Sequence, residues 1–258
     1  MIKFLCCLLV SFSLFSEIRE MHSLTELPID DFSEKTLVMF SIDDVLIYPQ
    51  DALLQHWRSD WKPQGVRVWT DEEDTVAWMH AQFQLMDPYG PKVIDALNQK
   101  GIPTIGFTSF AMDLAGLVQS IPKWRSRHLQ ALGIAFREER DIFFLAPMGF
   151  IPPSFEKGIL FCGDAFKKDK TNKGKVLTLF LDSLTWTPEL IVLIDAGQKH
   201  LVSVQETLDQ RGIPFLGFHY CPKEYDSIDE KIAELQYKTV IEEKRWLSDK
   251  EAKTSANG

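Results

Sequence analysis

Acidic residues follow two largely apolar segments of this chain at the points where each segment ends. Asp43 and Asp44 come directly after residues 37–42, and Asp195 follows residues 190–194. Apolar segments of this length between polar stretches are typical of buried parallel strands. Ligands of open α/β sheets bind beyond the carboxyl ends of such strands, so these three carboxylates are candidates for one shared site.

Three further side chains are candidates for the same site. Thr108 and Ser109 end an apolar strand predicted over residues 103–107, and Lys173 begins a helix predicted over residues 173–184. Hydroxyl groups, free backbone N–H groups and an ammonium at strand and helix ends could together hold an anion. The alternative for Lys173 is a solvated surface position, because other lysines surround it in the sequence. Asp43 and Thr108 could likewise be ordinary turn residues.

The elements that must position these residues alternate between strand and helix. This alternation predicts an α/β fold with a doubly wound, mainly parallel sheet and helices on both faces. Residues 99–103 and 210–214 carry nearly the same sequence, Gln-Lys-Gly-Ile-Pro and Gln-Arg-Gly-Ile-Pro. Each copy ends a predicted helix and starts a strand, so one helix-to-strand turn is used twice. The predicted strands are 36–40, 103–107, 142–145, 158–162, 190–194 and 214–218, and the predicted helices are 92–99, 121–132, 173–184 and 201–211. Residues 17–35 are predicted to be a polar lead-in, and a last helix is predicted to begin with a capping box of Ser227 and Glu230.

Residues 48–86 are long for a loop and hold four of the seven tryptophans. The acidic cluster at residues 71–74 favours a helix start. We therefore predict a helical cap inserted into a core formed by residues 17–47 and 87–249. The tryptophans either pack the cap against the core or form a contact surface for a partner. The polar residues 250–258 are predicted to be a disordered tail.

The ends and the composition of the chain indicate its location and partners. Lys3 precedes an apolar stretch that ends before Ser16, which predicts a signal peptide over residues 1–16 and an exported protein, periplasmic or secreted. No later apolar run is long enough to span a membrane. The net charge of −9 argues against broad nucleic-acid binding. Cys162 and Cys221 remain after cleavage, either as free thiols or as a disulfide.

The order of these residues resembles the haloacid-dehalogenase-like (HAD) superfamily of phosphohydrolases over about residues 36–220. The chain looks closest to uncharacterised exported bacterial members of that superfamily. In HAD enzymes the first strand ends in Asp-x-Asp-x-Thr, where the first Asp is the nucleophile and the second is the general acid/base. Here Ser41 stands at the nucleophile position, Asp43 at the acid/base position and Val45 at the Thr position.

The later HAD motifs are retained in part. Thr108 corresponds to the second motif and Lys173 to the third. Asp195 and Ala196 correspond to the fourth, where relatives often carry two adjacent acids. The resemblance implies catalytic roles for Asp43, Thr108 and Lys173, and magnesium ligation by Asp195 and Asp43.

The substitution of the nucleophile predicts an impaired site. A serine needs a base before it can attack phosphorus, and magnesium prefers anionic oxygen ligands, so magnesium binding should be weak or absent. We expect a catalytically impaired phosphohydrolase relative that keeps a cleft for a small phosphorylated or anionic ligand, with Ser41, Asp44 and Ser109 contacting that ligand. Two alternatives stay open: an active magnesium-dependent phosphohydrolase that uses Asp43 or Asp44, and a non-enzymatic interaction protein that uses the tryptophan-rich cap.

Overall fold

The computed structural model describes residues 16–58, 61–109, 118, 120–136, 141–143, 152–163, 173–222 and 227–256. Its strands are β1 (Ser16–Met21), β2 (Thr36–Ser41), β3 (Ile47–Pro49), β4 (Phe83–Leu85), β5 (Thr104–Thr108), β6 (Ile142–Phe143), β7 (Ser154–Glu156), β8 (Ile159–Phe161), β9 (Leu190–Asp195) and β10 (Phe215–Tyr220). Its helices are η1 (Leu24–Glu26), η2 (Ile29–Asp31), η3 (Ala52–Arg58), α1 (Asp71–His80), α2 (Gly90–Gln99), α3 (Ile121–Ala131), α5 (Lys173–Ser183), α6 (Gln198–Arg211), α7 (Glu230–Glu243) and α8 (Asp249–Ala256).

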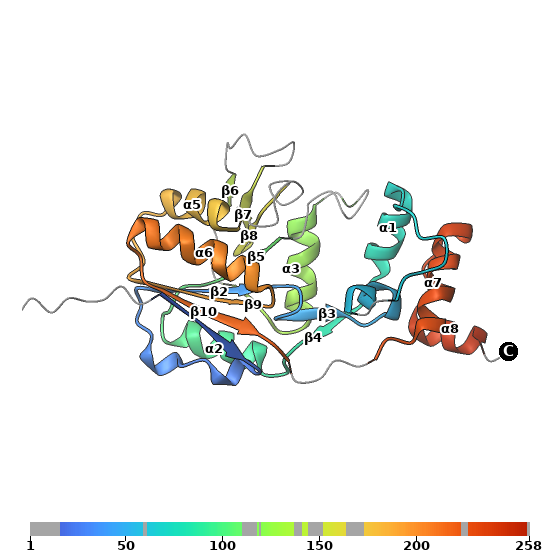
Figure 1. Cartoon of the computed structure of the whole chain (residues 1–258), viewed down its shortest axis with the longest axis horizontal. Helices are drawn as coiled ribbons and strands as arrows, with labels where there is room; N and C mark the ends of the chain where they lie inside the picture. The colour runs from blue at the N-terminus through green and yellow to red at the C-terminus, as the bar shows by residue number, and fades with distance from the viewer. Residues whose placement is uncertain are drawn as a thin grey trace, which may run out of the picture.

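One sheet organises the described part of the chain (Figure 1). It has eight strands in the order β1-β10-β9-β2-β5-β8-β7-β6. The first six strands in this order pair in parallel, and β8, β7 and β6 pair antiparallel at the far edge. The predicted doubly wound, mainly parallel α/β fold is confirmed.

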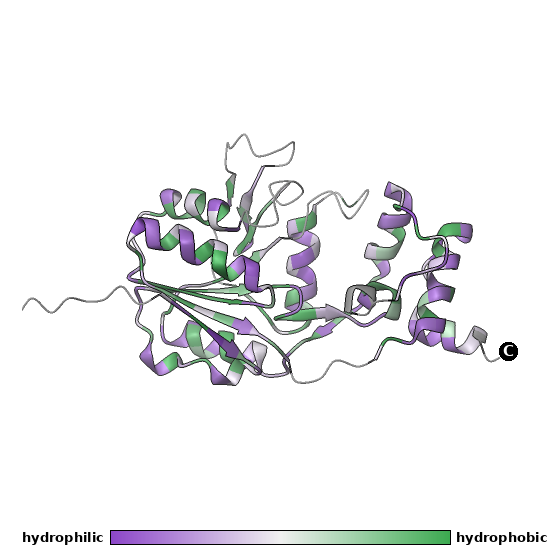
Figure 2. Ribbon diagram, viewed as in Figure 1, coloured by the Kyte–Doolittle hydropathy of each residue, from purple (hydrophilic) through white to green (hydrophobic). Residues whose placement is uncertain are grey.

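The central strands are buried on both faces because their side chains alternate between two hydrophobic clusters. Val38 and Phe40 of β2 face one cluster with side chains of α2 and α3, whereas Leu37 and Met39 face the other with side chains of α5 and α6. This two-residue period is the geometry of an extended strand. Figure 2 shows the central strands as mainly hydrophobic and the helices as hydrophilic along much of their length.

The repeated turn ends two helices in the same way. Gly101 after α2 and Gly212 after α6 both have left-handed backbones, with φ of 72° and 65°. Glycine adopts this conformation without the steric cost that a Cβ brings, so it ends helices well. In each copy the chain then enters a parallel strand, β5 or β10, as predicted.

A helical cap lies beyond the carboxyl ends of the central strands (Figure 1). The antiparallel pair of β3 and β4 brackets residues 50–82, which contain η3 and α1. Helix α7 packs on η3 and α1, and α8 packs on α7. The cap therefore has two sequence segments, whereas the predicted cap ended at residue 86 and the predicted core extended through residue 249.

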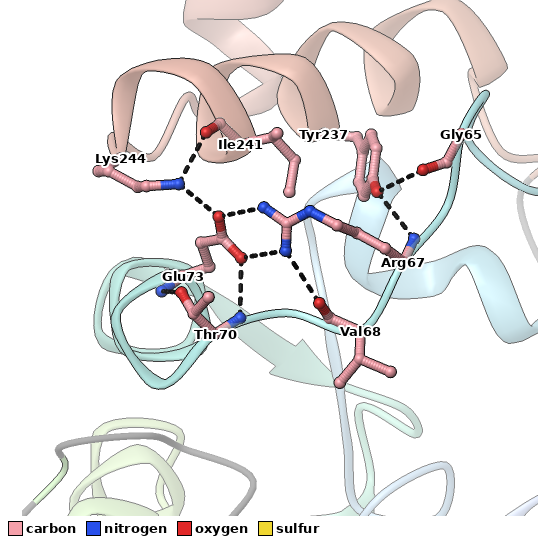
Figure 3. A network of polar contacts seen from close by, with 8 residues as sticks. All are labelled: Gly65, Arg67, Val68, Thr70, Glu73, Tyr237, Ile241 and Lys244. Atoms are coloured by element: carbon pink, nitrogen blue, oxygen red, sulfur yellow. Dashed lines mark hydrogen bonds and ion pairs between the residues drawn. The ribbon is translucent and has the colours of Figure 1, made fainter.

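A buried carboxylate ties these cap segments together (Figure 3). Glu73 of α1 is fully buried and accepts hydrogen bonds from the Arg67 guanidinium at 2.6 and 2.8 Å. The Lys244 ammonium at the end of α7 also contacts Glu73, and the Thr70 amide donates to it at 2.8 Å. The Arg67 side chain comes first among the contacts that keep the pKa of Glu73 well below its usual range. The loop before α1, α1 and α7 are thereby fixed to one another.

Both ends of the described chain differ from the predictions. Residues 17–35 were predicted as a polar lead-in, but β1 pairs with β10 over its whole length. The predicted signal peptide lies outside the described residues except for Ser16, which begins β1. Residues 250–258 were predicted to be disordered, but α8 runs through Ala256, and residues 257–258 lie outside the described part. Helix α8 forms because Ala252 is fully buried and because Ser248 and Glu251 exchange hydrogen bonds at its start.

The two cysteines of the described part, Cys162 and Cys221, are not bonded to each other. Both are free, with Cys162 fully buried and Cys221 partly buried. Burial raises the pKa of the Cys162 thiol to about 12, so this side chain is a core residue rather than a nucleophile. Of the two alternatives left open by the sequence, the structure has the free thiols.

Candidate functional site

The carboxyl ends of β2, β5 and β9 bring the predicted site residues together. Ser41 ends β2, Thr108 ends β5 and Asp195 ends β9, while Lys173 begins α5 above this edge of the sheet. Asp43 lies in the turn that follows β2, and its carboxylate accepts a hydrogen bond from the Thr108 hydroxyl at 3.3 Å. The strand ends predicted from sequence therefore place these side chains in one site.

Lys173 is buried at the centre of this site. Its side chain has no exposed surface, and its Nζ donates to Asp195 Oδ2 at 2.6 Å, to Ser41 Oγ at 3.3 Å and to the carbonyl oxygen of Phe107 at 3.1 Å. The alternative interpretation of Lys173 as a solvated surface lysine is wrong. All three hydrogens of the ammonium have protein acceptors within hydrogen-bonding distance.

Asp195 is equally enclosed and has both oxygens engaged. Oδ2 contacts Lys173, while Oδ1 accepts from the Gly197 amide at 2.8 Å and lies 3.0 Å from Nδ1 of His200. Burial raises the pKa of the Asp195 carboxyl, but Lys173 and His200 outweigh burial and lower it to about 2. His200 was not among the residues predicted from sequence, because its pairing with Asp195 depends on how α6 follows β9.

Asp43 is held by a second buried cation. Arg125 of α3 is fully buried, and its Nη2 lies 3.0 Å from Asp43 Oδ1. The guanidinium also lies over the rings of Phe83 and Trp124, at 5.0 and 4.8 Å from their centroids. Burial lowers the pKa of Arg125 and the Asp43 carboxylate opposes that effect. Sequence reasoning missed Arg125, since nothing local distinguishes it from the neighbouring Arg127.

Two more predicted residues, Asp44 and Ser109, are partly buried at the same strand ends. Asp44 has a left-handed backbone with φ of 65°, and its amide donates to the Ile47 carbonyl at 3.0 Å. This conformation is uncommon for residues other than glycine but is tolerated by Asp. The turn brings the chain back toward β3, and Ser109 follows β5 on the neighbouring strand. Asp43, Asp44 and Ser109 together line one side of a cavity.

This cavity, which we name the cap pocket, lies between the strand ends and the cap. Its volume is about 580 Å³, within the range of small-molecule sites. Apolar and aromatic side chains form most of its walls, and its only described cationic lining residue is Arg67. Lys173 and Arg125 are not among the lining residues. The walls include Leu53, Val66, Trp69, Trp78, Phe83 and Tyr237.

Two structural observations bear on metals and membranes. Among the described residues, no three His, Cys, Asp or Glu side chains are grouped so that they could hold a metal ion. No helix in the described ranges combines the length and apolar character needed to cross a bilayer.

The fold and the site define a doubly wound α/β protein with a capped pocket at the strand ends. Residues 15–253 match the model of a family described as "Protein of unknown function (DUF2608)", and the chain belongs to this family.

Three relatives come from bacteria. An uncharacterised protein of Rickettsia prowazekii is 24% identical over 270 residues, which cover 98% of this chain and 96% of the relative. A Chlamydia muridarum protein named "Putative outer membrane protein" is 37% identical over 95 residues, 35% of this chain and 34% of its own length. A Chlamydia pneumoniae protein with a similar name is 24% identical and covers 84% of this chain and 81% of its own length.

Proposed function

We propose that this chain is an exported ligand-binding relative of the HAD phosphohydrolases that has lost their hydrolytic mechanism. The observation that carries the proposal is the position of the Lys173 ammonium. It contacts both Ser41, at the place of the nucleophile, and Asp195, at the place of the metal ligand. The Lys173 ammonium thereby supplies the positive charge that a metal ion would otherwise bring to these two positions.

The donor set does not fit magnesium. A hard divalent cation prefers anionic oxygen ligands, and Ser41 offers a neutral hydroxyl. Asp195 is already compensated by Lys173 at 2.6 Å and by His200 at 3.0 Å. Asp43, the other predicted ligand, is paired with Arg125 at 3.0 Å. A magnesium ion would have to displace or repel these cations, so no catalytic step is assigned to it.

Ser41 also lacks what a nucleophile requires. A serine hydroxyl attacks only when a neighbouring base accepts its proton. Its described polar neighbour is the Lys173 ammonium, which donates to Ser41 rather than accepting from it. The carboxylates of Asp43 and Asp195 are held by Arg125 and Lys173. The site therefore supports binding rather than phosphoryl transfer.

Export is supported by two independent observations. Lys3 and the apolar residues that follow it have the pattern of a signal peptide. Two chlamydial relatives carry names that place those proteins in an outer membrane. Cell fractionation distinguishes a periplasmic form of this chain from a secreted one.

A phosphatase assay on the full chain tests the proposal. We expect 4-nitrophenyl phosphate to be hydrolysed no faster by the wild-type protein with millimolar magnesium than by an Asp43→Asn variant purified in parallel. The variant controls for contaminating phosphatase. Magnesium-dependent turnover that Asp43→Asn or Asp44→Asn abolishes would overturn the proposal and establish a phosphohydrolase with a shifted nucleophile.

A further inference from the structure

Two buried cations near the cap pocket are already paired with carboxylates. Lys173 and Arg125 are fully buried and contact Asp195 and Asp43, respectively. Neither lines the pocket. An anionic ligand needs positive charge that is free to pair with it. These two residues therefore do not provide an anion site in the pocket.

Arg67, the one cation among the described lining residues, is also engaged. Arg67 lines the pocket, but its guanidinium makes two hydrogen bonds to the buried Glu73 carboxylate. A ligand phosphate would have to compete with Glu73 for Arg67, because a bidentate guanidinium–carboxylate pair is a strong interaction. The described lining of the pocket consequently offers little attraction to a phosphorylated compound.

Asp74 of α1 supplies negative charge to the same pocket. It lines the cavity and is partly buried, and no described residue forms a hydrogen bond or ion pair with its carboxylate. Burial, together with the nearby Asp71 and Glu73 charges, raises the pKa of Asp74 to about 6. At pH 7.5 the carboxylate is ionised and faces the cavity without compensation.

Aromatic rings adjoin this carboxylate. Trp69, Trp78, Phe83 and Tyr237 all line the pocket, and Trp78 packs on Phe83 with ring centroids 6.5 Å apart and nearly parallel planes. The faces of aromatic rings carry partial negative charge and attract organic cations, and their surfaces also bury apolar groups. A carboxylate beside such walls is complementary to a cation with an apolar body.

Resting on the ligand-binding function proposed above, we propose that the cap pocket binds a small organic cation. The ligand would carry a protonated amine or quaternary ammonium that pairs with Asp74. Its apolar or aromatic body would lie against Trp69 and Trp78. This assignment replaces the phosphorylated or anionic ligand expected from sequence with a ligand of opposite charge.

Two matched probes test the sign of the ligand charge on the wild-type full chain. 2-Phenylethylamine and 3-phenylpropionate share a phenyl ring and a short alkyl chain but carry opposite charges at pH 7.5. We expect calorimetry to detect the amine, and we expect its affinity to exceed that of the carboxylate by at least about tenfold. Equal binding, tighter binding of the carboxylate, or no amine binding at millimolar concentration would overturn the inference.

Two variants on the same helix test the role of Asp74. Asp74→Asn should weaken amine binding by about tenfold or more. Glu72→Gln is the control, because Glu72 is exposed on α1 and does not line the pocket. An unchanged affinity in Asp74→Asn would overturn the assignment, as would an equal loss in Glu72→Gln. Circular dichroism and melting curves without ligand establish that both variants are folded.

The outcomes of the two proposals are distinguishable. Phosphatase turnover together with preferential amine binding would overturn the loss of hydrolysis and leave the pocket assignment intact. Absence of turnover together with preferential binding of phenylpropionate, or of inorganic phosphate added as a third probe, would overturn the cationic ligand alone.

Discussion

Replacing Lys173 by methionine tests whether the buried ion pair determines the character of the site. The substitution removes the ammonium but keeps a side chain of similar length in the core. It leaves the Asp195 carboxylate, which is 2% exposed, without its nearest cation. Removing one partner of a buried ion pair costs about 3–5 kcal/mol. The Gly197 amide and His200 still contact Asp195, so we expect a loss near the lower limit, about 3 kcal/mol.

Urea unfolding and thermal melting measure this loss directly. For a chain of this size, about 3 kcal/mol corresponds to a fall in melting temperature of roughly 6–12 °C. Lys175→Met is the matched control, since Lys175 lies on the same helix but is exposed. Its effect should stay within about 0.5 kcal/mol. The double variant Lys173→Met/Asp195→Asn removes both charges and should recover at least about 1 kcal/mol relative to Lys173→Met alone.

Two results would refute the reasoning. Lys173→Met could prove as stable as the wild type and as the Lys175→Met control, which would mean that Asp195 is not dependent on the ammonium. Alternatively, the double variant could be less stable than the single variant, which would mean that the two charges are not coupled. Either result would remove the basis for treating Lys173 as the cation of this site.

Three further expectations concern the cap, the pH dependence and the thiols. Glu73→Gln should lower the free energy of unfolding by about 2 kcal/mol. This loss is smaller than for a fully buried ion pair, because the cationic partners of Glu73 can regain water. Amide hydrogen exchange should accelerate in α1 before it accelerates in the sheet. Burial and the neighbouring Arg125 lower the pKa of His128 to about 4, so NMR should show His128 titrating near pH 4. The stability that the neutral imidazole contributes is present above about pH 6.5 and is lost as the pH falls toward 4. A thiol reagent should modify Cys221 in the folded protein, whereas Cys162 should react only on unfolding; rapid modification of both would contradict the burial of Cys162.

The central sheet was predictable because its strands carry strong local signals. β2, β5, β9 and β10 lie within two residues of the predicted limits, since each is a continuous apolar segment between polar or glycine-containing turns. The helices α2 and α6 end beside the predicted glycines, because Gly101 and Gly212 adopt the left-handed backbone that ends a helix. The carboxyl ends of parallel strands share one edge, so the proximity of Ser41, Thr108 and Asp195 followed from the fold alone.

The elements at the periphery were missed because tertiary contacts form them. β1 is an edge strand with mixed polar residues, and among its six residues only Met21 is fully buried. α8 is polar apart from Ala252 and Ala256, although Ser248 and Glu251 had the spacing of a capping box. The capping box expected for α7 at Ser227 was also wrong, because Asp229 is the N-cap and accepts from the Ile232 amide.

The pairing of charges within the site could not be read from the sequence. A lysine at a helix start can point to solvent, to a ligand or into the core, and only the packing of α5 against β9 selects the contact with Asp195. Arg125 reaches Asp43 from another helix across many residues of sequence. Spacing predicts which residues meet at a sheet edge, but not which carboxylate each cation neutralises.

The two-segment cap has a consequence for the order in which the protein is made and folded. All the strands of the described sheet precede residue 221, whereas α7 and α8, which complete the cap, follow it. During synthesis the ribosome therefore releases every strand before it releases Tyr237, which lines the pocket, and Lys244, which holds Glu73. The sheet can assemble while the pocket is still open. A nascent chain stalled before α7 would expose the aromatic residues around Trp69 and Trp78 to other proteins, and this interval is where a chaperone would be needed most.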